Sequence, residues 1–268
     1  MKGNEKISVL TAYDYSTSLI CDRAGVDVLL VGDSAGMVVL GYSSTVPVGM
    51  GEMMMFCGAV SRGAKRAMIV GDMPFGSYQP NASIAVENAV QLIKAGCDAV
   101  KLEGGSEIIG TMKALVDAGI PVMGHIGLKP QTQSLWEGYR LQGRTKESAM
   151  KLIEDAKALE KAGVYSIVLE MVASEVADTI TRSVSVPTIG IGSGAGCDGQ
   201  VLVLHDMLGI YEDIKPKFVK RYAELSMSIF DAVSRYANDI KTGKFPEESN
   251  TFHMSSEELE RWKKAKKK

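Results

Sequence analysis

Short apolar runs recur along the chain, and longer stretches with helical spacing separate them. The runs are rich in Val, Ile and Leu and are nearly continuous in apolar character, as is typical of parallel strands that are covered on both faces. We predict strands at residues 7–13, 27–32, 67–72, 98–103, 120–125, 165–170, 186–192 and 201–205. The pattern therefore indicates a parallel sheet.

Amphipathic helices are predicted between the strands, because apolar residues recur there at three- and four-residue spacing. They cover residues 16–23, 49–64, 82–95, 106–118, 146–162 and 174–182. Several are followed by a glycine placed as a C-cap: Gly25, Gly96, Gly119 and Gly163. Repetition of the strand–helix unit along the whole chain predicts an α/β fold, a (β/α)8 TIM barrel.

A doubly wound open sheet is the competing fold. It would usually carry G-x-G-x-x-G after its first strand, where this chain has Y-D-Y-S at residues 13–16. Gly190, Gly192 and Gly194 follow the seventh predicted strand instead. A phosphate-binding loop and a tight turn both explain glycines at that place.

The chain changes character after the last predicted strand. Residues 214–240 are predicted to form one long or broken helix, which Pro216 opens, and residues 241–250 form a polar loop. A short charged helix follows, with Ser255 as its N-cap. Because no linker separates a second domain, we expect a single barrel domain over residues 1–268 with a C-terminal helical extension, of which 255–268 is a charged tail.

Composition and charge exclude several classes of protein. The 268 residues are 46% hydrophobic and carry a formal net charge of −2, with one basic run at 263–268, so we expect no nucleic-acid partner. No apolar run approaches the ~20 residues of a membrane span, and we expect no membrane association. The four cysteines lack C-x-x-C spacing, and the start of the chain lacks an apolar leader. A cytoplasmic protein with buried free thiols is therefore expected.

Polar residues gather at the C-terminal ends of the predicted strands, whereas the middles of the strands are apolar. Those ends converge on one mouth in a parallel barrel, where active sites form. The candidate residues are Asp14, Asp33, Ser34, Asp72, Lys101, Glu103, His125 and Glu170.

Each candidate also has an ordinary structural explanation when it is taken alone. Asp33 or Asp72 would serve equally well as a helix cap. His125 would fit a hydrogen-bonded core histidine, and Lys101 a side chain that extends to solvent. Charges placed at random would not fall at the same end of five consecutive strands, so the joint pattern favours a site.

The residue types suit a hard cation and a 2-oxo acid. Two aspartates without an accompanying histidine or cysteine set favour Mg²⁺, which prefers carboxylate oxygen and keeps several exchangeable waters. A 2-oxo acid can replace those waters by chelating through its keto oxygen and one carboxylate oxygen. Chelation acidifies the carbon next to the carbonyl and stabilises the enolate formed there.

The remaining charges fit the same task. Lys101 and Glu103 are two residues apart, so on a strand they face the same side. We expect Lys101 to neutralise a substrate carboxylate or enolate oxygen, and Glu103 to hold a metal-bound water. Glu170 enters the mouth from the opposite side without a metal partner in the sequence, so it is a candidate general base.

At these residues the sequence resembles the ketopantoate hydroxymethyltransferase family. The resemblance is carried by T-A-Y-D at 11–14, V-G-D-S at 31–34, G-D-M-P-F at 71–75, V-K-L-E-G-G at 100–105 and G-H-I-G-L at 124–128. It continues with Q-G-R at 142–144, L-E at 169–170, D-G-Q at 198–200 and H-D at 205–206. These motifs occur in order over almost the whole chain, so together they are highly specific.

The resemblance implies an activity and a set of roles. The activity is transfer of a hydroxymethyl group from 5,10-methylenetetrahydrofolate to 3-methyl-2-oxobutanoate, which forms 2-dehydropantoate (ketopantoate) in pantothenate biosynthesis. By position, Asp33 and Asp72 ligate Mg²⁺, Glu103 lies in the outer shell of the metal, and Glu170 removes the C3 proton. The substrate is held by Asp33, Ser34, Asp72, Lys101 and His125. The resemblance also implies a homo-oligomer, often a decamer.

Two alternatives stay open at this point. The phosphoenolpyruvate mutase and isocitrate lyase group also binds an enolate with Mg²⁺ at a barrel mouth, but its lyases carry a K-K-C-G-H segment that is absent here. A non-catalytic barrel used as a binding module would need no metal. Retention of all the candidate carboxylates argues against that second alternative.

Overall fold

Eight parallel strands form a closed barrel in which every strand pairs with its neighbours in sequence and β1 pairs with β8. The computed structural model describes residues 2–132, 140–213 and 216–266. The strands are β1 (Ile7–Thr11), β2 (Val28–Val31), β3 (Met68–Asp72), β4 (Ala99–Glu103), β5 (Val122–Gly127), β6 (Ser166–Glu170), β7 (Thr188–Ile191) and β8 (Gly199–Leu202). The predicted (β/α)8 barrel is confirmed.

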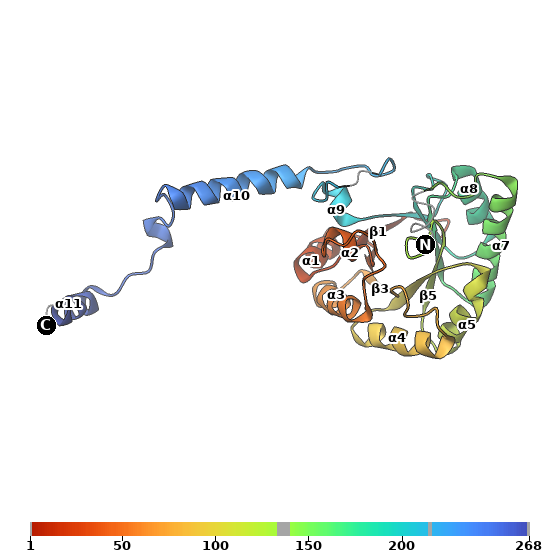
Figure 1. Cartoon of the computed structure of the whole chain (residues 1–268), viewed down its shortest axis with the longest axis horizontal. Coiled ribbons are helices and arrows are strands. Elements are labelled where there is room, and N and C mark those ends of the chain that lie inside the picture. The colour runs from red at the N-terminus through yellow and green to blue at the C-terminus, as the bar shows by residue number, and fades with distance from the viewer. Residues whose placement is uncertain (1, 133–139, 214–215, 267–268) are drawn as a thin grey trace. The chain divides into compact units, whose positions relative to one another are not determined.

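Helices surround the strands (Figure 1). They are α1 (Tyr15–Arg23), α2 (Ala35–Val38), α3 (Met50–Gly63), α4 (Ala82–Lys94), η1 (Ser106–Ile108), α5 (Ile109–Asp117), α7 (Lys146–Ala162), α8 (Ser174–Ser183) and α9 (Leu204–Met207). The six predicted helices of the barrel are confirmed to within a few residues. Gly163 caps α7 in the left-handed region at φ 96°, a conformation that glycine adopts without strain.

The last strand begins earlier than predicted, and the helix that follows it begins later. The last strand begins at Gly199 rather than at residue 201, because its backbone pairs with Ile7 and Ser8 of β1, and such pairing does not require apolar side chains. The helix predicted from residue 214 begins only at Leu225, and its first two positions lie outside the described residues. Lys217 and Phe218 line a cavity at the barrel mouth, so tertiary contacts hold this segment out of a helix.

The glycine-rich segment after β7 forms a tight turn. Gly192 and Gly194 have φ of 65° and 81°, and between them the Ser193 hydroxyl donates a hydrogen bond to the Leu169 carbonyl at 2.7 Å. The same hydroxyl accepts a hydrogen bond from Val172 N–H at 3.0 Å. The turn therefore ties the end of β7 to the end of β6, and these contacts account for the glycines.

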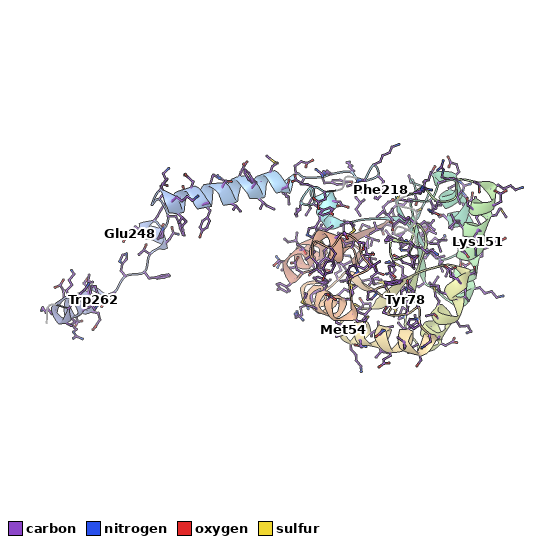
Figure 2. The ribbon with its side chains drawn as sticks, in the orientation of Figure 1. Met54, Tyr78, Lys151, Phe218, Glu248 and Trp262 are labelled. Atoms are coloured by element: carbon purple, nitrogen blue, oxygen red, sulfur yellow. The ribbon has the colours of Figure 1, made fainter. Side chains whose placement is uncertain are left out.

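The core has two parts. Between strands and helices lies a continuous layer of buried apolar side chains, in which all four cysteines are buried and free, as predicted. Inside the barrel a smaller cluster fills the lower half: Ile7, Val9, Val28, Leu30, Val70, Ala99, Met123, Val168, Ile189 and Val201. Lys151 lies on the outer surface of the barrel, and Tyr78 lies in the layer between strands and helices (Figure 2).

The chain divides into two compact units, Met1–Tyr222 and Ala223–Lys268. The second contains α10 (Leu225–Lys241), η2 (Glu248–Asn250) and α11 (Ser256–Ala265), and Ser255 caps α11 as predicted. None of the side chains of α10 is buried. In the described part of the chain, every helix is too short or too polar to cross a membrane.

Candidate active site

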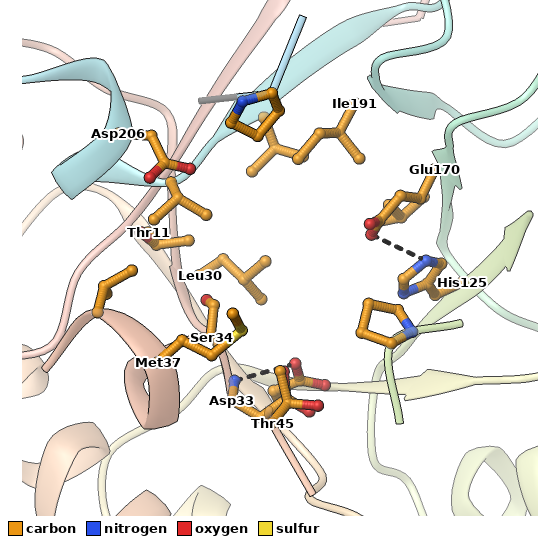
Figure 3. Close-up of a pocket in the computed structure, with 18 of the residues that line it drawn as sticks. Thr11, Leu30, Asp33, Ser34, Met37, Thr45, His125, Glu170, Ile191 and Asp206 are labelled. Atoms are coloured by element: carbon orange, nitrogen blue, oxygen red, sulfur yellow. Dashed lines mark hydrogen bonds and ion pairs between the residues drawn. The ribbon is translucent and has the colours of Figure 1, made fainter. Parts of the chain in front are cut away.

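A cavity of about 400 Å³ opens at the C-terminal ends of the strands (Figure 3). The predicted site residues that line it are Asp33, Ser34, Asp72, Lys101, Glu103, His125 and Glu170. Asp14 is the exception among the candidates. Its carboxylate accepts a hydrogen bond from Thr17 N–H at 2.9 Å and caps α1, which is the ordinary role of an aspartate before a helix.

Strand register brings the charges together. Asp72 of β3 lies beside Lys101 of β4, and Glu103 of β4 lies beside His125 of β5. Side chains alternate along a strand, so Asp72, Lys101 and His125 share the inner face with the apolar side chains two positions earlier. Glu103 shares the same face, two positions after Lys101. The predicted convergence of strand ends is therefore confirmed for these residues.

Asp33 and Asp72 form a buried pair of carboxylates. The Asp33 N–H donates to Asp72 Oδ2 at 3.3 Å, and the two residues are 5% and 1% exposed. Burial, followed by the negative charge of Asp72, raises the pKa of Asp33 to about 7. Burial also raises the pKa of Asp72. Two carboxylates held this close repel each other when both are charged, and a bound cation would offset that repulsion.

Lys101 lines the cavity among the carboxylates and faces three partners. Its Nζ lies 2.8 Å from Asp72 Oδ1, 4.0 Å from Glu103 Oε1 and 3.3 Å from His125 Nδ1. Burial lowers the pKa of Lys101, but Asp72, Glu103 and Asp33 outweigh burial, and the net pKa is raised. One positive charge thus faces several carboxylates, and the cavity has a deficit of positive charge.

His125 lies between Lys101 and Glu170. Burial, with a smaller contribution from Lys101, lowers the pKa of His125 well below its ordinary value, so the ring is neutral. An ammonium can only donate, so His125 Nδ1 accepts from Lys101 and the ring proton is assigned to Nε2. That atom lies 3.4 Å from Glu170 Oε2 (Figure 3) and makes no hydrogen bond with the described residues.

Glu170 is held in an unusual local environment. Burial raises its pKa to about 8, Asp33 and Asp72 add to the increase, and Lys101 opposes it. The next residue, Met171, has φ 47°, a left-handed conformation that non-glycine residues rarely adopt. Gly127 at the end of β5 has φ 100°, and a Cβ there would collide with the Glu170 carbonyl. Strain of this kind often marks functional sites.

Ser34 lies beside the aspartate pair. It begins α2 without making a capping hydrogen bond through its side chain. Instead, its hydroxyl lies 2.8 Å from the hydroxyl of Tyr13, which is buried. Ser34 Oγ is therefore kept at the cavity rather than against the helix.

Apolar side chains complete the cavity. Leu30 and Val168 belong to the barrel interior and form its floor, and Met37, Ile191 and Val203 lie along its walls. The cavity therefore combines a cluster of charges with an apolar surface, as small-molecule sites commonly do.

The predicted site residues did not include Gln131, Tyr78 or Asp206. Gln131 is fully buried and contacts both Asp33 and Glu103, and Tyr78 contacts Gln131. Asp206 lines the cavity away from the aspartate pair, and burial raises its pKa to about 6. A lone glutamine in a loop or a tyrosine before a helix carries no sequence signal of such a role. Asp206 falls within a motif that carried the family resemblance.

The chain is similar to a family of known enzymes. The family model described as Ketopantoate hydroxymethyltransferase matches residues 1–248. The 3-methyl-2-oxobutanoate hydroxymethyltransferase of Nitrosopumilus maritimus (strain SCM1) is 60% identical over 260 residues, which are 97% of this chain and 93% of that protein. That of Cenarchaeum symbiosum (strain A) is 59% identical over 260 residues, which are 97% of this chain and 98% of that protein.

The fold is also found in solved structures with little sequence similarity. Phosphonopyruvate hydrolase in complex with oxalate and Mg²⁺ has a TM-score of 0.58 at 12% identity, covering 97% of this chain and 91% of that chain. At this identity the likeness shows the fold alone.

Proposed function

Since the chain belongs to the ketopantoate hydroxymethyltransferase family and acts as a hydroxymethyltransferase on 3-methyl-2-oxobutanoate, we propose how its residues carry out that reaction. Asp33 and Asp72 hold Mg²⁺, and Glu170 removes the C3 proton of the 2-oxo acid. The observation that carries the proposal is a buried aspartate pair that shares one cavity with a carboxylate of raised pKa.

The donor set fits Mg²⁺. Two buried carboxylates whose pKa values are raised lie at one side of the cavity, and among the described residues no group of three His, Cys, Asp or Glu side chains is arranged to hold a metal ion. Mg²⁺ suits such a site, because it binds through one or two carboxylates and fills the remaining positions with water or substrate oxygen. When bound, the ion would polarise the keto group of a chelating 2-oxo acid and acidify its C3 proton.

Glu170 takes that proton, and His125 positions it. In the ligand-free protein the raised pKa of Glu170 shows that its charged form is poorly solvated, and a poorly solvated carboxylate is a stronger base. We expect the 3.4 Å contact between His125 Nε2 and Glu170 Oε2 to become a hydrogen bond when substrate binds. Such bonds are commonly long in ligand-free enzymes and shorten when substrate binds.

The other residues bind the acid. Lys101 and Ser34 neutralise and orient its carboxylate, and Glu103 fixes the Lys101 ammonium from 4.0 Å away. The branched alkyl group lies on the apolar floor of Leu30 and Val168. Water breaks the two C–N bonds that hold the one-carbon unit on the donor, which leaves as tetrahydrofolate. The C3 carbanion then bonds to the released carbon, whose oxygen comes from water and takes up the proton that Glu170 removed.

The donor and the assembly are also part of the proposal. We take 5,10-methylenetetrahydrofolate as the donor of the one-carbon unit and a homo-oligomer, a decamer, as the working form. Both rest on the family resemblance. The apolar side chains exposed on α10, such as Phe230 and Val233, support association, because large exposed apolar surfaces commonly mark interfaces.

Proton exchange tests the proposal without the donor. We expect the C3 proton of 3-methyl-2-oxobutanoate to exchange in D₂O in the presence of enzyme and Mg²⁺ and to stay in place when the metal is chelated, as followed by NMR. Exchange that is equally fast without a divalent ion would contradict the metal role. Cleavage of isocitrate or 2-methylisocitrate, with no exchange on 3-methyl-2-oxobutanoate, would favour the lyase alternative.

A further inference from the structure

We propose that Gln131 is a positioning residue that holds two carboxylates of the mouth, Asp33 and Glu103, in the orientation that metal binding requires. The inference rests on the proposed Mg²⁺ site and assigns a residue that acts through that site. Gln131 lies in the loop after β5 and is 0% exposed.

The side-chain amide and the backbone N–H of Gln131 both donate hydrogen bonds to residues of the barrel mouth. Its side-chain Nε2 donates hydrogen bonds to Asp33 Oδ2 at 2.9 Å and to the Met73 carbonyl at 3.0 Å. Its backbone N–H donates to Glu103 Oε2 at 3.1 Å. One loop residue therefore links carboxylates from the ends of β2 and β4, which no strand pairing connects directly.

The surroundings allow the Gln131 amide one orientation. Tyr78 is 1% exposed, and its hydroxyl lies 2.8 Å from Gln131 Oε1. Two acceptors thus face the amide nitrogen, and a donor faces the amide oxygen. A flipped amide would place its oxygen against the Asp33 carboxylate and the Met73 carbonyl, so the hydrogen-bond network excludes the flip.

This network sets the geometry of the aspartate pair. The Gln131 amide binds one oxygen of Asp33, and the Asp33 N–H binds one oxygen of Asp72. One oxygen of each carboxylate is therefore held before a cation arrives, and Lys101 holds the second oxygen of Asp72. Partners that orient ligands in this way commonly change metal affinity by about 10- to 100-fold when they are removed.

A glutamine-to-methionine pair of variants tests the role. Gln131→Met keeps the length of the side chain and the backbone N–H but removes the amide. The matched control is Gln91→Met on α4, whose Nε2 donates only to Asn88 Oδ1 at 3.1 Å, on the outside of the barrel. Binding of Mn²⁺ to the full chain, without substrate, is measured from the EPR signal of the free ion.

We expect Gln131→Met to bind Mn²⁺ about 10- to 100-fold more weakly than wild type and Gln91→Met to bind it like wild type. The activity that Gln131→Met loses should return as the Mg²⁺ concentration is raised, which a general folding defect would not allow. Wild-type Mn²⁺ affinity in Gln131→Met, or a loss of activity that Mg²⁺ does not restore, would overturn the inference.

Tyr78→Phe is the second variant, for the case that Gln131→Met does not fold. It leaves Gln131 in place and removes the hydroxyl that orients the amide, so weaker Mn²⁺ binding is expected, and unchanged binding would overturn the inference. A wild-type protein that binds neither Mn²⁺ nor Mg²⁺ would instead overturn the proposed metal site itself. The failures of the two proposals are therefore distinguishable.

Discussion

The lower and upper halves of the barrel interior are built on the same strands but have opposite chemistry. Val70, Ala99 and Met123 of the lower half are buried apolar residues. Two residues further along the same strands come Asp72, Lys101 and His125, which are equally buried and are polar or charged. Burial of apolar area stabilises the first set, whereas burial of charge destabilises the second unless partners compensate it.

Residues that determine stability and residues that determine activity therefore lie on the same strands, two positions apart. Substitutions in the lower half should mainly change the free energy of unfolding, and substitutions at the mouth should mainly change the rate of the reaction. The three predictions below test this separation, from the largest expected effect to the smallest.

Glu170→Gln should have the largest effect on rate. We expect C3 proton exchange to fall by about 10²–10⁴-fold, because an amide cannot accept the proton, while 3-methyl-2-oxobutanoate still binds. Exchange in D₂O and calorimetric titration measure the two quantities. Glu175→Gln, at an exposed position of α8, is the control. Unchanged exchange in Glu170→Gln would rule out Glu170 as the base.

Met123→Ala should have the largest effect on stability. Met123 is 2% exposed at the centre of the lower half, and its truncation leaves a cavity there. We expect the free energy of unfolding to fall by about 2–5 kcal/mol, with proton exchange per folded molecule little changed. Chemical denaturation measures the loss, and Met150→Ala, at a residue 49% exposed on α7, is the control. If the loss of proton exchange per folded molecule, expressed as a free energy, exceeded the loss in free energy of unfolding, the separation would be contradicted.

The smallest effect is expected in the slope of stability against pH, measured per pH unit. The raised pKa of Glu170, about 8, means that the folded protein holds a proton that the unfolded chain releases near pH ~4.3. Without metal, the free energy of unfolding should therefore fall as pH rises between these values, by at most about 1.4 kcal/mol per pH unit for one group. Glu170→Gln should flatten the slope, and an identical slope would contradict the prediction.

Much of the fold follows from the sequence because strands covered on both faces are apolar throughout. All eight predicted runs start within two residues of the observed strands, and β8 alone starts earlier than predicted, because Gly199 and Gln200 are not apolar. Likewise, the segment that leads into α10 follows tertiary contacts at the mouth rather than its own helical pattern. Neither the backbone pairing of β8 nor the contacts at the mouth can be read from the pattern of apolar residues along the chain.

The site was predictable where its residues end a strand, and hidden where they do not. Asp72, Glu103, His125 and Glu170 each close a predicted apolar run, Lys101 lies two residues before such an end, and the barrel brings these positions together. Gln131 lies in a loop whose path depends on Tyr78 and Met73, so its role emerges only in three dimensions.

The alternation of side chains along β4 restricts which insertions and deletions this protein can accept during evolution. Lys101 and Glu103 face the mouth, whereas Val100 and Leu102 pack in the layer next to the helices. Insertion or deletion of a single residue within the strand would exchange the two sets and place an ammonium and a carboxylate among apolar helices. Differences in length between related proteins are therefore expected in the connecting loops. Changes of substrate would arise there, while the register of the eight strands stays the same.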